Sequence, residues 1–163
     1  MELWEVLRWI HMFAGLAWWG EVFYINFVLT PALPKLEPAV KEKVMLELYP
    51  RMFRMATILS SLTISFGVLT ALSLSGFDLT IFVNTYWGQL IFLGGSLGLF
   101  MFLLHMTVER VELKVLRYRK SGTGGELPSE LRGLERRMTW LPRFGFLILT
   151  LVLVIMVYAA QGF

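Results

Sequence analysis

The chain has 163 residues, of which 56% are hydrophobic, and it carries a formal net charge of +3 at neutral pH. It contains no cysteine, so disulfides, thiolate catalysis, cysteine-held iron–sulfur clusters and covalently attached c-type haem are excluded. The mean hydropathy is +0.64, and the apolar residues stand in blocks rather than at the amphipathic spacing of a soluble core. No nucleic-acid-binding motif is present. We therefore expect one integral membrane domain over residues 1–163, in contact with the lipid bilayer and without a nucleic-acid partner.

Four apolar stretches are each long enough to cross the roughly 30 Å of hydrocarbon in a bilayer as a helix. A helix is required because a lipid-exposed segment must satisfy its own backbone hydrogen bonds. The predicted fold class is therefore an all-α, integral membrane four-helix bundle. The expected spans are Leu3–Thr30, Met55–Leu74, Ile81–Val108 and Trp140–Tyr158.

The connections between these spans differ in length and charge. In the first, Pro38–Leu48 has apolar residues at helical spacing, which predicts a short helix lying at the membrane interface. The second, Ser75–Asp78, is predicted to be a tight turn. The third, Glu109–Thr139, is long and charged. It is expected to extend the third helix, to break near residues 121–125, and to form a further short helix over Pro128–Arg137.

Basic residues are concentrated on one side of the predicted bundle. They flank the first and third connections, whereas the opposite side carries Arg8 alone. Because cytoplasmic loops are enriched in Lys and Arg, we expect both termini on the outer side of the cell membrane and the loops 31–50 and 109–139 in the cytoplasm. The basic residues that support this orientation are Lys35, Lys41, Lys43, Arg51, Arg54, Arg110, Lys114, Arg117, Arg119, Lys120, Arg132, Arg136, Arg137 and Arg143.

The first helix carries His11 about two turns from its start. Gly15 and Trp18 share its helical face, and Gly15 removes a side chain where a flat ligand could approach. Two interpretations remain open: a structural histidine bonded to a neighbouring helix, and an axial ligand of a b-type haem. Met156 in the fourth helix lies at a similar depth and is a candidate sixth ligand, although methionine more often fills a packing gap.

The other histidine, His105, lies near the cytoplasmic end of the third helix and shares a face with Gly94 and Gly98. Small residues four positions apart favour close approach of another helix, and a tetrapyrrole needs the same absence of side chains. His105 is a second candidate metal ligand. Helical rise separates it from His11 by roughly 25 Å along the membrane normal, so the two are not expected to share an iron within one subunit. Two sites, or one haem with His11 and a different or absent second ligand, both fit the sequence.

Glu21 lies in the inner half of the first helix, and Arg54 opens the second helix at a comparable depth. An ion pair between them would neutralise both charges within the membrane. Together with His105 the pair is interpreted as an inner-leaflet site for a proton or a haem propionate, or alternatively as a salt bridge that sets helix register. Asn26 is expected to hydrogen-bond across helices near the same level.

Several methionines are predicted to lie at the depth of His105. Thioethers combined with one imidazole suit Cu(I), which makes copper binding an alternative to haem. Packing of an irregular bundle explains the same methionines without a metal. The residues concerned are Met52, Met55, Met101, Met106 and Met138.

Two runs carry a resemblance to a known family. They are HMFAGLAWWGEVFYINFVLTP over His11–Pro31 and YPRMFRMATILSSLTISFGVLTA over Tyr49–Ala71. Together they resemble the CopD/HemJ-like membrane superfamily, and they look closest to the N-terminal membrane domain of cytochrome-linked urate oxidases. The resemblance implies a haem b bundle in which His11 is a ligand. Gln89, shortly after Trp87, stands where HemJ-type enzymes carry a lysine, so the resemblance does not extend to protoporphyrinogen oxidation.

From the sequence we expect a haem b-binding membrane protein that transfers electrons or converts a small apolar or quinone-like substrate by a redox step. The expected cofactor site comprises His11, Gly15, Trp18, Arg54 and the glycine pair of the third helix. A homo-oligomer is expected because four helices enclose a tetrapyrrole poorly. A copper-handling protein and a haemless accessory subunit are the alternatives.

Overall fold

The computed structural model describes residues 2–120 and 141–161, and within these ranges it contains helices and no strand. Helix α1 spans Leu3–Tyr24 and continues through a π-helical turn at Ile25–Leu29, the short α2 at Thr30–Ala32 and a 3-10 turn at Leu33–Lys35. Helix α3 spans Pro38–Leu74, α4 Ile81–Asn84, α5 Tyr86–Lys120 and α7 Leu141–Ala160.

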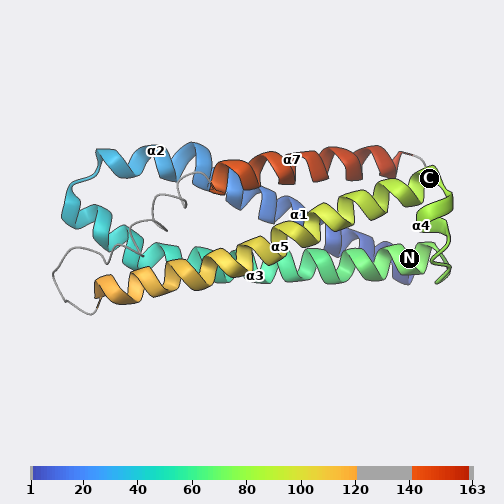
Figure 1. Cartoon of the computed structure of the whole chain (residues 1–163), viewed down its shortest axis with the longest axis horizontal. Helices are drawn as coiled ribbons and strands as arrows, with labels where there is room; N and C mark the ends of the chain where they lie inside the picture. The colour runs from blue at the N-terminus through green and yellow to red at the C-terminus, as the bar shows by residue number, and fades with distance from the viewer. Residues whose placement is uncertain (1, 121–140, 162–163) are drawn as a thin grey trace.

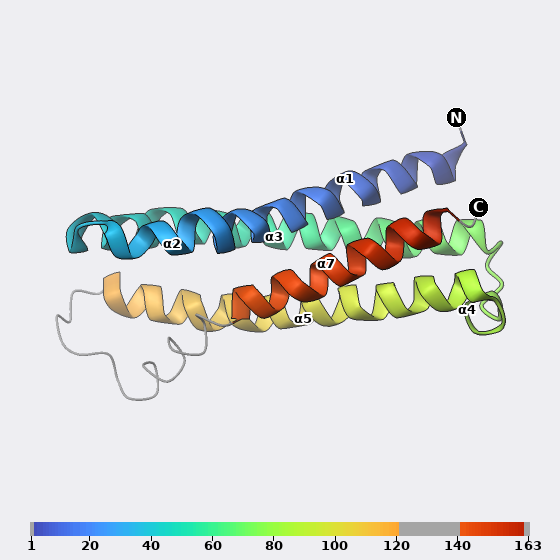
Figure 2. The same ribbon diagram turned by 90° about the horizontal axis from the view of Figure 1, so that it is seen from above.

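The long helices run up and down beside one another as an elongated bundle (Figure 1 and Figure 2). Helix α1 packs along α3, α3 along α5 and α5 along α7, and α7 returns to contact α1. Both termini and residues 75–85 lie at one end, which we call the terminal end. The opposite end, which we call the basic end, carries residues 31–50 and 110–120.

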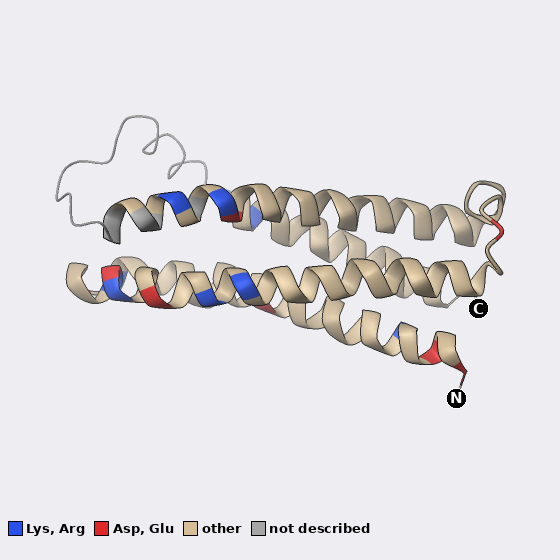
Figure 3. Cartoon of the chain, turned by 90° about the horizontal axis from the view of Figure 1, so that it is seen from below, with Lys and Arg blue, Asp and Glu red and all other residues tan. Residues whose placement is uncertain are grey.

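Four helices are long and apolar enough to cross a membrane, as the sequence predicted. Their bounds are Leu3–Lys35, Pro38–Leu74, Tyr86–Val115 and Leu141–Ala160. Charged residues are concentrated toward the two ends of the bundle and are sparse along its middle (Figure 3). The arrangement therefore matches a bundle whose middle is solvated by hydrocarbon.

The separate interfacial helix predicted over Pro38–Leu48 is wrong, because these residues begin the continuous 37-residue helix α3. Pro50 lies inside this helix without ending it. A proline removes only one hydrogen bond, and no glycine nearby helps to break the helix. At 1.5 Å per residue α3 is roughly 55 Å long, so it exceeds the roughly 30 Å of hydrocarbon and extends beyond it. The predicted extension of the third helix is confirmed as far as Lys120. The short helix predicted over Pro128–Arg137 lies outside the described residues.

The third span begins later than predicted. Residues 81–84 form the separate α4, and Thr85 is extended before α5 starts at Tyr86. The Thr85 hydroxyl accepts a hydrogen bond of 3.0 Å from the Gly88 N–H, as the N-cap of a helix does. It also donates to the Ile81 carbonyl at 2.8 Å. This capping turn folds α4 back against the start of α5 and shortens the third span.

The tight turn predicted after the second span is present. Gly76 and Phe77 have φ angles of 60° and 63°, in the left-handed region that glycine adopts freely and phenylalanine seldom does. Beyond them, the Asp78 carboxylate accepts hydrogen bonds from the Thr80 N–H at 2.9 Å and from the Thr80 hydroxyl at 2.7 Å. These bonds hold the pKa of Asp78 below its ordinary value. The turn thus satisfies its own polar groups.

Helix α1 joins α7 toward the basic end. The Asn26 side-chain amide donates to the Val22 carbonyl at 2.8 Å and to the Pro142 carbonyl of α7 at 3.0 Å. This confirms the predicted bond between helices. A π-helical turn displaces the helical hydrogen bonds by one residue, and Asn26 supplies a donor within that turn. The core beside it contains Trp18, Ala56, Met101 and Leu149.

We predict that Gly88→Ala destabilises the start of α5. An added Cβ would overlap the Ile81 carbonyl and lie 2.7 Å from the Phe82 Cα, and both are backbone atoms that cannot turn aside. The expected loss is about 1–3 kcal/mol of unfolding free energy, seen as a lower Tm in detergent. Gly95→Ala is the matched control on the same helix, because nothing lies within 4 Å of its added Cβ. An equal Tm for the two variants would contradict the turn geometry.

Candidate functional site

His11 lies between α1 and α3, and its ring is held in one tautomer. Its Nδ1 atom lies 2.7 Å from the backbone carbonyl oxygen of Thr63. A carbonyl can only accept a hydrogen bond, so Nδ1 carries the proton and donates. In the neutral ring the lone pair then resides on Nε2. Histidines that bind metals are oriented in this way, with one nitrogen donating to a carbonyl and the other free to ligate.

Gly67 provides the space for this ring. A Cβ added at Gly67 would lie 2.7 Å from the His11 Nδ1 and 2.8 Å from Cε1, closer than real Cβ contacts allow. The Nδ1–Cε1 edge of the ring therefore rests on the backbone of α3. The sequence analysis missed both Gly67 and the Thr63 carbonyl. A glycine in the middle of an apolar helical run was the available signal for the first, whereas a backbone carbonyl leaves no signal in a sequence.

Neighbouring side chains of this chain occupy the space beside the glycines that were predicted to line a tetrapyrrole. An added Cβ at Gly15 would meet Thr63 Cγ2 at 3.4 Å, and one at Gly98 would meet Ile64 Cδ1 at 3.5 Å. At Gly94 it would meet Met156 Cε at 2.6 Å. Trp18 is only 3% exposed and belongs to the packed core. Within this chain these residues act as close helix contacts, so a flat ring does not lie on them without rearrangement.

Met156 and His11 nevertheless lie at the same level of the bundle. Gly98 is opposite Ile64 on the antiparallel α3, so Gly94, one turn away, is opposite Val68. Met156 packs on Gly94, and His11 packs on Gly67. The similar depth predicted from the sequence is thus consistent with the structure. The two side chains occupy different interfaces, between α5 and α7 and between α1 and α3.

The bundle opens on the His11 side toward the terminal end. Among the described residues, the side-chain hydrogen bonds and ring contacts that join α1 and its π-helical continuation to α7 involve Trp19, Phe23, Asn26 and Phe27, and none involves an earlier residue. From there toward the terminal end α1 and α7 diverge (Figure 1). The His11 Nε2 has no hydrogen-bond partner among the described residues, and it is not fully buried. It thus remains accessible for a ligand.

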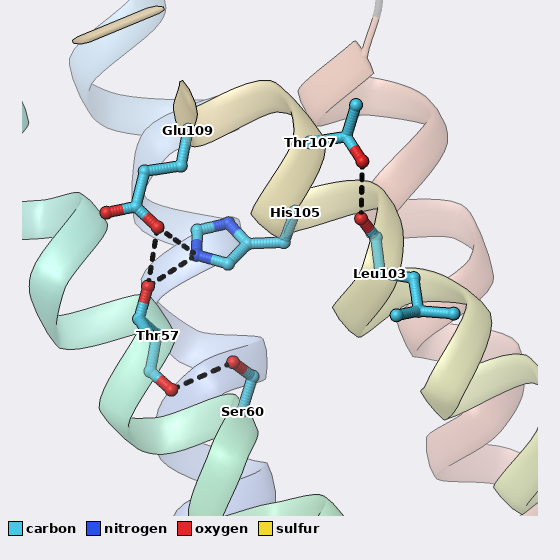
Figure 4. Close-up of polar contacts among 6 residues, drawn as sticks. All are labelled: Thr57, Ser60, Leu103, His105, Thr107 and Glu109. Atoms are coloured by element: carbon cyan, nitrogen blue, oxygen red, sulfur yellow. Dashed lines mark hydrogen bonds and ion pairs between the residues drawn. The ribbon is translucent and has the colours of Figure 1, made fainter. Parts of the chain in front are cut away.

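His105 belongs to a second, separate polar cluster at the other end of the spans. Its Nε2 atom lies 3.2 Å from the Thr57 hydroxyl oxygen, which lies 2.8 Å from Glu109 Oε2 (Figure 4). Glu109 Oε2 is itself 3.8 Å from the His105 Nε2. A backbone hydrogen bond to Phe53, one turn before Thr57 on α3, also engages the ring. The side chains of His105 and Glu109 are only 14% and 17% exposed. Glu109 and Thr57 were not expected partners of His105.

The donors in this cluster have a fixed direction. A carboxylate only accepts hydrogen bonds, so the Thr57 hydroxyl donates its single proton to Glu109. Thr57 must therefore accept from His105, whose Nε2 carries a proton. The Nε2 atom is thus committed as a donor, so Nδ1 is the ring nitrogen of His105 that could ligate a metal.

The separation of the two histidines is smaller than the sequence estimate of roughly 25 Å. His11 lies opposite Gly67 and His105 opposite Thr57, and ten residues of α3 correspond to roughly 15 Å. The estimate was too large because it placed the midpoints of the first and third spans at one level, whereas the contacts of each helix with α3 set their relative positions. The two rings remain too far apart to share one iron.

The expected ion pair between Glu21 and Arg54 is wrong. The described residues contain no such pair within 4.0 Å, and Arg54 is exposed. Glu21 Oε2 is instead buried without a hydrogen-bond partner. The antiparallel register puts Glu21 and Thr57 at one level along the bundle, but the Arg54 side chain, one turn from Thr57, is exposed rather than paired with Glu21. The sequence predicts the depth of each residue in the bundle, and depth by itself does not determine which side chains pair.

Two of the methionines predicted to lie near His105 have different surroundings. Met101 is in the core, where its Cε lies 3.0 Å from the Cβ position of Gly145, whereas Met55 is exposed on α3. Met138 lies outside the described residues. Those residues contain no group of three or more His, Asp or Glu side chains placed to hold a metal.

Comparisons with protein-family models, with curated proteins and with solved structures found no match to this chain.

We predict that Gly67→Ala displaces the His11 ring. The new methyl group would occupy the position of the Nδ1–Cε1 edge and would break the bond to the Thr63 carbonyl. The chain has two histidines, so selective 15N-histidine labelling yields two resolvable rings. The expected result is loss of the Nδ1-protonated signal of His11. Gly20→Ala, which has nothing within 4 Å of its added Cβ, should leave the signal unchanged.

Proposed function

We propose that this chain is a haem b-binding membrane protein that carries out electron transfer or a redox conversion of a small quinone-like substrate. The supporting observation is the tautomer of His11. Its Nδ1–H donates to the Thr63 carbonyl, and its accessible Nε2 has the lone pair that an iron requires. The resemblance of His11–Pro31 and Tyr49–Ala71 to the CopD/HemJ-like superfamily points the same way.

In this proposal His11 would hold the haem iron through Nε2. Met156, which lies at the same level, would be the candidate for a second ligand. Bound haem would supply one-electron chemistry, and the apolar surroundings would tune its potential. Gly15, Gly94 and Gly98 are occupied within the chain, so we place the remainder of the haem site where α1 diverges from α7. A second copy of the chain would complete that open side, which agrees with the expected homo-oligomer.

The proposal places the chain in the cell membrane with both termini outside. Among the described residues, basic side chains are concentrated at the basic end, whereas the terminal end carries Arg8 beside Glu2, Glu5 and Asp78 (Figure 3). An excess of Lys and Arg favours the cytoplasmic side. In this orientation His11 lies in the outer half of the membrane and His105 in the inner half.

Copper handling is the alternative chemistry, through His105 and methionines. It would use Nδ1 of His105, because Nε2 donates to Thr57. It is less well supported because Met101 is packed in the core and Met55 is exposed. A haemless accessory subunit is the remaining alternative, and one spectrum separates all three.

We predict that the protein purified from membranes has a Soret band and visible bands that sharpen on reduction. His11→Ala should abolish or strongly shift the Soret band, because the iron loses its ligand. His105→Ala is the matched control and should leave the band in place. Met156→Leu should alter the spin-state bands if its thioether ligates. A colourless protein that retains Cu(I) would support the copper alternative, and a colourless protein without metal the accessory one.

The cluster of His105, Thr57 and Glu109 supports a second role, proton transfer at the basic end. Its hydrogen bonds run in one direction, from Nε2–H to the Thr57 oxygen and from the Thr57 O–H to Glu109. A proton leaving Nε2 of the charged imidazolium can pass to the hydroxyl oxygen while the hydroxyl proton passes to the carboxylate. The result is a neutral imidazole and a protonated Glu109, and the total charge is unchanged.

Charged groups from all the packed helices lie near the level of this cluster. Arg54 of α3, Arg110 of α5 and Arg143 of α7 are exposed around it, and Glu21 of α1 lies at the level of Thr57. The cluster is therefore a proton site bordered by cations, as expected at the cytoplasmic boundary.

We predict that Thr57→Val uncouples His105 from Glu109, because it removes the hydroxyl that bridges them at 3.2 Å and 2.8 Å. The 15N signal of the His105 Nε2–H should shift in Thr57→Val, whereas Thr57→Ser should preserve it. Thr107→Val is the control, since the Thr107 hydroxyl donates to the Leu103 carbonyl of its own helix (Figure 4). An unchanged Nε2–H signal in Thr57→Val would contradict the relay.

A further inference from the structure

Arg8 of α1 is a cation without an anion. It lies within the apolar helix Leu3–Lys35, and it is the basic residue of the terminal end among the described residues. Its guanidinium group makes no ion pair within 4.0 Å there, and its Nε atom is buried without a hydrogen-bond partner. The two Nη atoms are not fully buried and remain accessible. Charged groups in a membrane helix normally mark a functional site.

The carboxylates nearest to Arg8 in the chain are bonded to other donors. Glu5 Oε2 accepts a hydrogen bond of 2.8 Å from the Glu2 N–H, and Glu2 Oε2 accepts one of 2.6 Å from the Trp4 Nε1–H. The guanidinium group instead lies over the Trp4 ring, with its Cζ atom 5.2 Å from the ring centroid. This cation–π contact orients the side chain but leaves its charge unpaired.

Arg8 and His11 border the same open side of the bundle. The two residues are three positions apart, so their side chains are neighbours on the surface of α1. Arg8 also precedes Trp19 by eleven residues, or three helical turns, and therefore shares its face of the helix. Trp19 donates to the Thr150 hydroxyl of α7 at 3.0 Å. Nearer the terminal end α1 has diverged from α7, so this face is uncovered at Arg8 (Figure 1).

One ligand can satisfy both side chains if it combines an electron-pair acceptor with an anionic group. Haem b has an iron at its centre and two propionates at one edge. Trp4, which lies beneath the guanidinium group, is roughly 10 Å from the level of His11 by helical rise. That is comparable with the distance from the centre of a porphyrin to its propionate carboxylates. Arginine is suited to this role because its planar fork donates two parallel hydrogen bonds to a carboxylate.

We propose that Arg8 binds a propionate of the haem that His11 would hold, which turns the propionate edge of the ring toward the terminal end. The inference rests on the proposed function, because it orients the cofactor of that site. Arg54, the propionate residue expected from the sequence, is less suitable. It precedes Gly67, the neighbour of His11, by thirteen residues of α3, which is roughly 20 Å. A phospholipid phosphate would satisfy Arg8 but would leave His11 without a ligand.

The test is a titration of the haem-free protein in phosphatidylcholine nanodiscs, followed at the Soret band. The probes are haemin and its dimethyl ester, in which both carboxylates are uncharged. The ester partitions more strongly into lipid, so the quantity compared is the ratio of the two dissociation constants in each protein. Arg8→Gln should reduce the preference for haemin about tenfold, as expected for the loss of one hydrogen-bonded charge pair. Arg8→Lys should retain part of the preference because the charge remains.

Two further variants locate the site. Arg110→Gln is the matched control, since Arg110 is exposed at the basic end, and it should retain the full preference. Arg54→Gln tests the opposite orientation of the ring and should also retain it. An equal preference in the unaltered protein, Arg8→Gln and Arg8→Lys would overturn the proposal, as would a loss confined to Arg54→Gln. Retention of phosphatidylglycerol that depends on Arg8, with no change in the preference, would assign Arg8 to a lipid headgroup instead.

The same titration separates this proposal from the haem proposal. If both probes give a Soret band that His11→Ala abolishes, and Arg8→Gln leaves their ratio unchanged, the Arg8 proposal fails alone. If neither probe gives a Soret band that depends on His11, the haem proposal fails and the Arg8 proposal fails with it.

Discussion

The antiparallel contact between α1 and α3 is the constraint on which the rest of the arrangement depends. Two close approaches hold its register: the ring of His11 lies against the backbone at Gly67, and Gly15 meets the side chain of Thr63. Both contacts are short and neither tolerates a slip by one residue, since a slip would drive a side chain into the opposing backbone. The register fixes the tautomer of His11, because the Thr63 carbonyl lies within reach of Nδ1 only in this alignment. It also determines the level at which Glu21 faces α3.

Hydrophobic burial alone would not set such a register. In a membrane the hydrocarbon around a helix is as apolar as the helix itself, so close packing and hydrogen bonds determine which helices meet. This chain uses small residues for the purpose. Glycines on α3, α5 and α7 receive His11, Met156 and Met101. The polar bonds then add specificity, as where Asn26 of α1 binds the Pro142 carbonyl of α7.

The hydrogen-bond partner of each histidine determines which of its ring nitrogens carries the proton. His11 donates from Nδ1 to a carbonyl and keeps Nε2 accessible. His105 donates from Nε2 to Thr57, which passes its own proton toward Glu109. The first geometry suits a ligand and the second suits a proton path. A distance of roughly 15 Å along α3 separates them, which is too far for a shared metal.

The sequence by itself determined which four helices are long and apolar enough to cross a membrane, the extension of the third helix and the bond from Asn26 to another helix. These follow from length, apolar composition and the cost of an unsatisfied amide in hydrocarbon, which act locally. Only the tertiary structure decided which polar side chains interact. Glu21 has an unpartnered carboxyl oxygen instead of the predicted ion pair with Arg54, and His105 is hydrogen-bonded to Thr57. The opening helix shows the reason. Helical rise gives the depth of a side chain, but its neighbour depends on the rotation and register of two helices, and those are set by close contacts that no single helix contains.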